Sequence, residues 1–207
     1  TLKGYTFAFW YLGEDEQNAT AYDFDTPVTE NITLTAKWNI NKYTVTFNSY
    51  GGTPVPPAQE VEYGLTATEP AAPEKTGYTF DGWYLGDEKY DFSAAVEQNI
   101  TLTAKWEKKT YKVVAKLYVN GKPAYYQNTD FYTYEVSGLY GEAIDFDTIK
   151  AKAVEQAKQI KKASASYTAV ILEDHEPNAV CATYGEHQPN QATHYVKVNV
   201  KTEENVV

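Results

Sequence analysis

The sequence contains the stretch Asn-Ile-Thr-Leu-Thr-Ala-Lys-Trp at residues 31–38, and it contains the same stretch again at residues 99–106. Tyr-Asp-Phe precedes both copies, at residues 22–24 and at residues 90–92, with the same offset of 68 residues. The two segments are therefore copies of one repeat. Within the stretch apolar and polar residues alternate, which predicts a strand that covers a core on one side.

Further upstream, Gly-Tyr-Thr-Phe at residues 4–7 returns at residues 77–80, with an offset of 73 residues. The offset falls from 73 to 68 because the first copy carries five additional residues between Gly13 and Tyr22. The inserted region is polar and lies between two apolar segments. It is therefore expected to form an exposed turn between two strands.

The repeat boundaries divide the chain into three parts. Residues 1–38 form a partial repeat, residues 39–107 a complete repeat, and residues 108–207 a C-terminal domain. The half that corresponds to residues 43–76 does not precede the partial repeat, and the sequence has no methionine. We expect the chain to be a piece of a longer, processed polypeptide whose export signal or wall anchor lies outside it.

The complete repeat has the pattern of a small β-rich module. Residues 43–47 alternate in polarity and predict a strand. Residues 53–58 contain three prolines, which remove backbone donors and exclude a strand there. Further strands are predicted at residues 60–63, 78–85 and 100–106, and no helix of ordinary length fits this copy.

Five features of this copy carry a family resemblance: Tyr43-Thr-Val-Thr-Phe47, Gly51-Gly52, the Pro-rich passage to Pro73, Gly77-Tyr-Thr-Phe-Asp-Gly-Trp-Tyr84, and Asn99 to Trp106. They resemble the Listeria-Bacteroides repeat, the family that includes the B repeat of internalin B. The resemblance covers residues 43–106 and a partial copy at residues 4–38. It implies a small β-grasp-like module, repeated in tandem on secreted or surface-anchored bacterial proteins, with spacing and binding roles and no known active site.

The C-terminal domain, residues 108–207, resembles no family by name. Asn120-Gly121 is a strong signal for a type I′ hairpin, so residues 113–119 and 124–126 are expected to pair. A further strand is predicted near residues 131–136.

A helix is predicted at residues 146–163, behind Asp145 or Asp147 as the N-cap. Its expected apolar face is made by Ile149, Ala153, Val154, Ala157 and Ile160. Two more strands are predicted at residues 167–172 and 195–200. The order strand, strand, helix, strand, strand (ββαββ) is compatible with a β-grasp-like arrangement, so the expected class is mainly β with one helix, α+β, built from tandem small modules.

Composition and charge limit which binding partners and locations are expected. The formal charge of −10 repels a phosphate backbone, so nucleic acid is not an expected partner. No segment approaches the length of a membrane span, so we expect no membrane insertion within this fragment. The chain is expected to be a monomer, located outside the cell on a bacterial surface or cell wall.

Reactive side chains are few. His175, Cys181, His187 and His194 are the only cluster that resembles a metal or catalytic site, and their spacings match no zinc pattern. A polar loop is the preferred interpretation, and no motif of a hydrolase, phosphate loop or metalloprotease occurs. We therefore expect no catalytic residue, no bound metal and no cofactor.

Aromatic residues crowd one region of the C-terminal domain and are the candidate site. Aromatic rings can anchor a host protein or a glycan, although cross-strand packing explains most such rings. The candidate partner-binding residues are Tyr125, Tyr126, Phe131, Tyr132, Tyr134 and Tyr140.

The function expected from these features is that of a non-catalytic stalk or adhesion module of a bacterial cell-surface or secreted protein. It contributes spacing and binding to a host protein or glycan. The alternative is an accessory region of a surface-anchored hydrolase whose catalytic domain lies outside this fragment.

Overall fold

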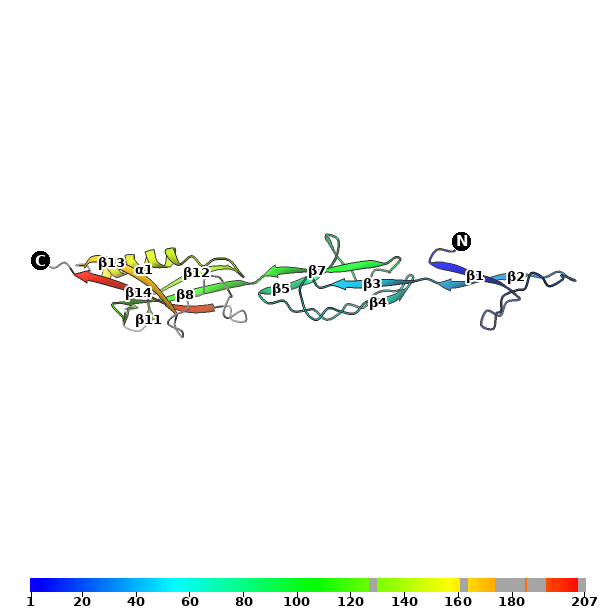
Figure 1. Cartoon of the computed structure of the whole chain (residues 1–207), viewed down its shortest axis with the longest axis horizontal. Helices are drawn as coiled ribbons and strands as arrows, with labels where there is room; N and C mark the ends of the chain where they lie inside the picture. Colours follow the sequence, from blue (N-terminus) through cyan, green and yellow to red (C-terminus); the bar gives the residue numbers. More distant parts are fainter. Residues whose placement is uncertain (127–129, 161–163, 174–184, 186–192, 205–207) are drawn as a thin grey trace. The chain divides into compact units, whose positions relative to one another are not determined.

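The computed structural model describes residues 1–126, 130–160, 164–173, 185 and 193–204 (Figure 1). The chain divides into two compact units, one formed by Thr1–Glu74 with Phe80–Trp106 and the other by Lys75–Thr79 with Glu107–Val207. The described part consists mainly of strands, together with one helix. The predicted class, mainly β with one helix, is confirmed.

The partial repeat forms a two-stranded antiparallel sheet. Strand β1 (Tyr5–Leu12) pairs with β2 (Leu34–Ile40), and the register shifts between Phe7 and Phe9. One apolar face of this hairpin is poorly covered: Phe7 is 42% exposed and Trp10 is 43% exposed.

The complete repeat forms a five-stranded sheet in the order β4-β3-β7-β5-β6. Its strands are β3 (Lys42–Asn48), β4 (Gln59–Glu62), β5 (Tyr78–Leu85), β6 (Glu88–Lys89) and β7 (Ile100–Lys108). All four predicted strands are present, and the Pro-rich residues 54–58 lie outside any strand. The central pair, β3 and β7, is parallel, whereas β4 and β6 pair antiparallel with their neighbours.

The core of the complete repeat forms around Trp83, which is 1% exposed. Its ring meets Phe47 and Phe80 edge-on, with centroids 5.0 and 5.5 Å away. Leu102 and Ala104 of β7 are buried beside it, while Thr101 faces solvent. The predicted one-sided burial of this strand is confirmed.

The C-terminal unit contains a sheet in the order β12-β8-β14-β13, with β9 paired to the end of β8. These strands are β8 (Thr110–Val119), β9 (Lys122–Pro123), β12 (Thr133–Leu139), β13 (Ser164–Glu173) and β14 (Thr193–Glu204). Strands β8 and β14 are parallel, and β12 and β13 pair antiparallel with them. This is the strand order of β4-β3-β7-β5, with the first strand again beside the last.

The predicted hairpin is present at Asn120-Gly121, where φ is positive at both residues as a type I′ turn requires. Its predicted extent is wrong. The ladder with β8 stops at Pro123, beyond which only Ala124 follows the prediction and donates its N–H to the carbonyl of Leu117 at 3.0 Å, and β10 (Tyr125–Tyr126) pairs instead with β11 (Asp130–Phe131). The reason is that β12 occupies the same edge of β8 as far as Lys116, which leaves room for only a short β9.

Helix α1 (Phe146–Ile160) packs on the sheet of the C-terminal unit (Figure 1). Asp145 is its N-cap: its carboxylate accepts hydrogen bonds from the backbone N–H and the hydroxyl of Thr148, at 3.0 and 2.6 Å. Ile149, Ala153 and Ala157 are buried as predicted. Ile160 is 45% exposed, so its predicted place on the apolar face is wrong, because it ends the helix beyond the last buried turn.

Candidate functional site

The candidate aromatic residues occupy different environments. Tyr125 is 45% exposed, whereas Tyr132, Tyr134 and Tyr140 pack against the core of the C-terminal unit. Tyr126 and Phe131 are described in their backbone only, as cross-strand partners in the pairing of β10 with β11. Among the candidate side chains that are described, Tyr125 therefore offers the most surface to a partner.

Tyr134 is a candidate residue that packs into the core of the C-terminal unit. Its hydroxyl is buried and has no hydrogen-bond partner among the described residues. Burial raises the pKa of Tyr134 to about 12, with smaller contributions from Tyr132 and Glu155. The phenol therefore stays neutral at physiological pH and acts as part of the core.

Tyr140 forms a docking contact with Gly77 inside the C-terminal unit. The N–H of Tyr140 donates to the carbonyl of Lys109 at 3.0 Å, and the N–H of Lys109 donates to the carbonyl of Gly77 at 2.9 Å. A Cβ on Gly77, where φ is +78°, would lie 2.2 Å from the Tyr140 ring. Glycine is required here both by the backbone conformation and by the ring that covers it.

The same contact occurs in the first unit, between Tyr63 and Gly4. Tyr63 donates its N–H to Asn41 at 2.8 Å, Asn41 donates its N–H to Gly4 at 2.9 Å, and the Tyr63 ring covers the glycine. Each tyrosine is followed by a glycine with positive φ, Gly64 or Gly141. The Tyr-Gly pairs at residues 63–64 and 140–141 were the sequence signal for this contact, which the strand and motif patterns had missed.

A polar group surrounds the first of these contacts. Lys3 Nζ lies 2.9 Å from a carboxylate oxygen of Glu97, and the hydroxyl of Tyr63 donates to the other oxygen at 3.1 Å. These bonds raise the pKa of Lys3 and lower the pKa of Glu97, with the hydrogen bond between the two groups as the largest cause. Lys3 and Glu97 are exposed and Tyr63 is half-buried, so the ion pair positions the chain and contributes little stability of its own.

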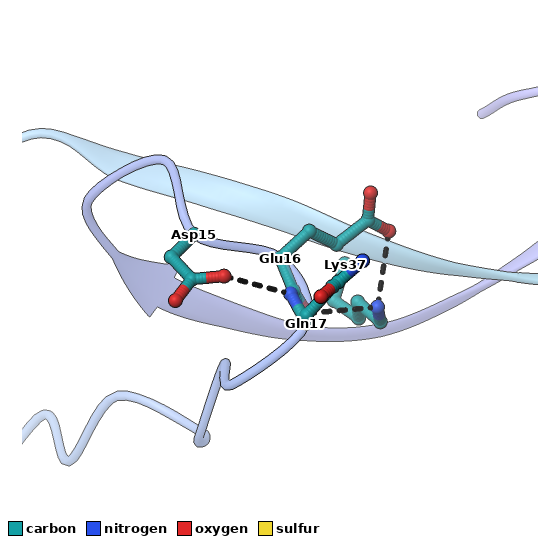
Figure 2. Close-up of polar contacts among 4 residues, drawn as sticks. All are labelled: Asp15, Glu16, Gln17 and Lys37. Atoms are coloured by element: carbon teal, nitrogen blue, oxygen red, sulfur yellow. Dashed lines mark hydrogen bonds and ion pairs between the residues drawn. The ribbon is translucent and has the colours of Figure 1, made fainter.

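The inserted turn of the first copy is exposed, as predicted. Asp15 accepts a hydrogen bond from the N–H of Gln17 at 3.1 Å, and Lys37 contacts the carbonyl and the carboxylate of Glu16 at 3.1 and 3.0 Å (Figure 2). The lysine at the same repeat position, Lys105, lies 3.5 Å from Asp87 in the shorter turn of the second copy. The repeated lysine thus holds the turn in both copies, although the turns differ in length.

Two hollows open on the described surface. One, of about 260 Å³, lies beside the inserted turn and is lined by residues between Leu12 and Asp23. The other, of about 560 Å³, lies between α1 and β13, with Lys150, Glu155 and Lys158 at its border. Neither brings together a set of groups that resembles a catalytic site.

The predicted polar loop lies mostly outside the described residues. His175, Cys181 and His187 are not described, and His194 stands on β14, opposite Val113. Within the described ranges, no group of three His, Cys, Asp or Glu side chains is placed to hold a metal ion. The helix in those ranges, α1, is also too short and too polar to cross a bilayer.

Comparison with known proteins gives one family and several relatives. A family model described as the Listeria-Bacteroides repeat domain matches residues 1–37 and 43–105. A protein of Evansella cellulosilytica named as a membrane protein is 42% identical over 147 residues, which is 69% of this chain and 20% of the relative. A Gly-rich membrane protein of the same organism is 47% identical over 54% of this chain and 13% of the relative. Internalin H of Listeria monocytogenes is 42% identical over 52% of this chain and 20% of the relative. The chain spans a fifth or less of the length of these relatives.

Proposed function

Because residues 1–37 and 43–105 belong to the Listeria-Bacteroides repeat family, we propose that the chain is a non-catalytic stalk module of a bacterial cell-surface or secreted protein. In this proposal it is a monomer outside the cell and contributes spacing between other parts of a longer protein. The similarity to internalin H and to two proteins named as membrane proteins supports a place in the cell envelope.

The observation that carries the proposal is what the two copies repeat. The repeated groups hold turns and junctions: Lys37 and Lys105 bind their turns, and Gly4 and Gly77 are each covered by a tyrosine ring. A repeated catalytic group would have been expected if the repeats carried chemistry. The described residues instead repeat a framework, which suits a spacer.

We also propose that the chain comprises three modules, residues 1–38, 39–107 and 108–207, and that the two larger ones are β-grasp-like. The supporting observation is their common strand order, in which the first strand lies between the parallel last strand and an antiparallel strand, β4 or β12. In the C-terminal module α1 packs on that sheet. In the complete repeat, the corresponding part of the chain is the connection between β4 and β5, residues 63–77, which contains Pro70 and Pro73.

The adhesive part of the proposal concerns the aromatic region of the C-terminal module. A host protein or a glycan would contact Tyr125, with Tyr126, Phe131 and Tyr132 beside it in the sequence. Tyr134 and Tyr140 would support the site from the core. Tyr125 carries this step because it is the most exposed of the described candidates.

Surface labelling tests the location. Antibodies raised against the 207-residue chain should label intact, unpermeabilised cells of the source bacterium, or should detect the parent protein in the culture medium. Labelling that appears only after permeabilisation would refute the proposal. The parent reading frame then separates the alternatives, since a hydrolase domain beside the repeats would make this chain an accessory region of an enzyme.

Binding is tested separately with an array of glycans and extracellular-matrix proteins. The whole chain is compared with Tyr125→Ala and with a control, Tyr50→Ala, whose side chain is also exposed but lies in the complete repeat. Adhesion through the aromatic region predicts binding that Tyr125→Ala abolishes and Tyr50→Ala leaves intact. Binding by all three proteins would place the adhesive site elsewhere, and binding by none would leave spacing as the function.

A further inference from the structure

We propose that each of the two larger modules contains a mechanical clamp, formed by its first and last strands, that resists tension along the chain. This inference rests on the proposed function, because a surface-anchored stalk is pulled through its two ends. The clamp of the complete repeat is the pair β3 and β7, and the clamp of the C-terminal module is the pair β8 and β14.

Strand direction decides how such a pair is loaded. Because β3 and β7 are parallel, the chain enters the module at one end of the pair, at Lys42, and leaves it at the other end, at Lys108. Tension between these points acts along the strands and slides one past the other. All hydrogen bonds between the strands then carry the load together, and they must break together.

The stretch over which β3 and β7 pair in the complete repeat is short, but a side-chain contact reinforces it. The paired residues run from Val45 with Ile100 to Asn48 with Thr103. The hydroxyls of Thr46 and Thr101 are 2.8 Å apart across the pair. This contact adds a side-chain hydrogen bond to the backbone ladder on its more exposed face.

A side-chain hydrogen bond lengthens the β3–β7 pair at one end, and burial on one face shields the pair from water. The N–H of Thr44 donates to the side-chain oxygen of Asn99 at 2.8 Å, one step before the backbone ladder begins. On the opposite face Val45 and Leu102 are completely buried. Water therefore cannot easily replace the ladder hydrogen bonds on that side as the strands begin to slide.

The overlap in the C-terminal module is longer. Its paired residues run from Lys112 with Thr193 to Val119 with Val200, eight pairs against four in the complete repeat. Beyond the ladder, the N–H of Gly121 donates to the side chain of Asn199 at 2.9 Å. The longer overlap loads more bonds at once, so this module should yield at the higher force.

Side chains on both faces of this longer pair also connect the two strands. Lys116 of β8 lies over the ring of Tyr195 of β14, 5.3 Å from its centroid, and Lys197 of β14 lies 5.7 Å from the centroid of Tyr118 of β8. Such cation–π contacts cross the pair in both directions. On the inner face, Val196 and Val198 are fully buried, as is Leu117.

The partial repeat supplies an internal contrast. Strands β1 and β2 are antiparallel, so the residues through which tension would enter and leave this hairpin, Tyr5 and Ile40, are partners at the same end of the pair. Tension there opens the pairs one after another from that end. In the described residues of the partial repeat no parallel pair exists, so it should open at the lowest force.

Single-molecule force spectroscopy on the whole chain, held by its two termini, tests the proposal. We expect two resolved unfolding events, which differ in released length because an extended chain spans about 3.5 Å per residue and the C-terminal module is longer. The longer release should occur at the higher force, and the partial repeat should open without a resolved peak. Unfolding of both modules without a force peak would overturn the proposal.

The direction of pulling provides a sharper comparison. In a Cys181→Ala background, handles on Lys42→Cys and Lys108→Cys load the β3–β7 pair along the strands. Handles on Lys42→Cys and Gln98→Cys load it from one end, because Gln98 lies two residues before Ile100, where the overlap starts. The rupture force should fall severalfold in the second geometry, since forced rupture follows the unfolding rate under load. Equal forces in both geometries would refute the clamp.

Substitutions on the pair complete the test. Thr46→Val with Thr101→Val keeps the shape and removes the hydroxyl contact, so it should lower the force of the shorter event. Thr79→Val is the matched control, because Thr79 is an exposed residue of β5, outside the loaded pair. These force measurements use the isolated chain, so they can contradict the clamp while surface labelling supports the proposed function. Surface labelling can likewise contradict the proposed function while the force measurements support the clamp.

Discussion

Replacing Trp83 with alanine removes the largest fully buried side chain of the complete repeat. A buried tryptophan removes up to about 250 Å² from water, which sets an upper limit of about 6 kcal/mol at 25 cal/mol per Å². Large-to-small substitutions of aromatic residues in cores cost about 3–5 kcal/mol. We therefore expect Trp83→Ala to lower the free energy of unfolding of this module by about 4 kcal/mol.

Trp10 is the matched control, because it occupies the same position in the partial repeat. It is 43% exposed and packs mainly beside Phe7, with ring centroids 5.6 Å apart. Trp10→Ala should cost about 2 kcal/mol, in proportion to the smaller area it buries, and only in the β1–β2 hairpin.

Amide hydrogen exchange reports on each module separately and suits a chain of several units. Trp83→Ala should accelerate exchange of the Leu102 amide about 1,000-fold, the equivalent of 4 kcal/mol. Trp10→Ala should leave that amide unchanged. Equal effects of the two variants on the Leu102 amide, or no effect of Trp83→Ala, would contradict a core built around Trp83.

A second variant at the same position separates packing from polarity. The indole N–H of Trp83 is buried without a hydrogen-bond partner among the described residues. Trp83→Phe removes this unpaired donor and keeps an aromatic ring, so it should cost less than about 2 kcal/mol. A cost equal to that of Trp83→Ala would show that the indole itself is needed.

Three further predictions concern single residues. An alanine in the left-handed backbone conformation costs ~1–2 kcal/mol of stability. Gly77→Ala should lower the stability of the C-terminal unit by more than this in thermal unfolding, because the added Cβ also meets the Tyr140 ring. Gly86→Ala has open space around its Cβ, so it should cost only the backbone part. Asp145→Ala should lower the melting temperature of the C-terminal unit through loss of the helix cap. Hydrogen bonds from Thr148 lower the pKa of Asp145 in the folded state. The carboxylate's contribution to stability is therefore complete above the unfolded pKa of about 3.9 and is lost as the pH falls through the lower folded pKa. Melting temperatures measured between pH 2 and pH 6 would follow this loss. Tyr134→Phe should be neutral or stabilising in urea unfolding, because it removes a buried hydroxyl without a partner in the described residues.

Each of these predictions has a clear contrary result. Equal costs for the two glycine variants would mean that the tyrosine ring moves aside. A melting temperature of the Asp145→Ala protein that matches the parent at pH 6 would rule out the cap as a stabilising contact. A marked loss of stability in Tyr134→Phe would mean that the hydroxyl has a partner after all.

Local sequence patterns were sufficient for most of the elements. The strands of the complete repeat follow from alternation and from proline, which excludes a ladder at residues 54–58. The cap at Asp145 and the turn at Asn120-Gly121 depend on neighbouring residues only, so they were predictable. The error at Ile160 arose because periodicity continues to the end of a helix, whereas burial ends where the packing surface ends.

The candidate aromatic site was predicted less well. Sequence proximity groups Tyr125 with Tyr132 and Tyr134, but only the pairing of the strands decides which rings face the core. Tyr134 stands opposite Ala115 of β8 and packs inward, while Tyr125 belongs to the short β10–β11 pair and is exposed. No local pattern distinguishes these tyrosines.

The sequence by itself determined the repeat family, the strands and the single helix, because these depend on periodicity, turn residues and internal similarity. Only the tertiary structure decided which identical residues are buried, since Trp10 and Trp83 share a repeat position and differ in what covers them. It also decided that the first and last strands of each larger module are parallel neighbours. Such pairings join residues more than fifty positions apart, and their energy comes from a core that exists only once the whole module has folded.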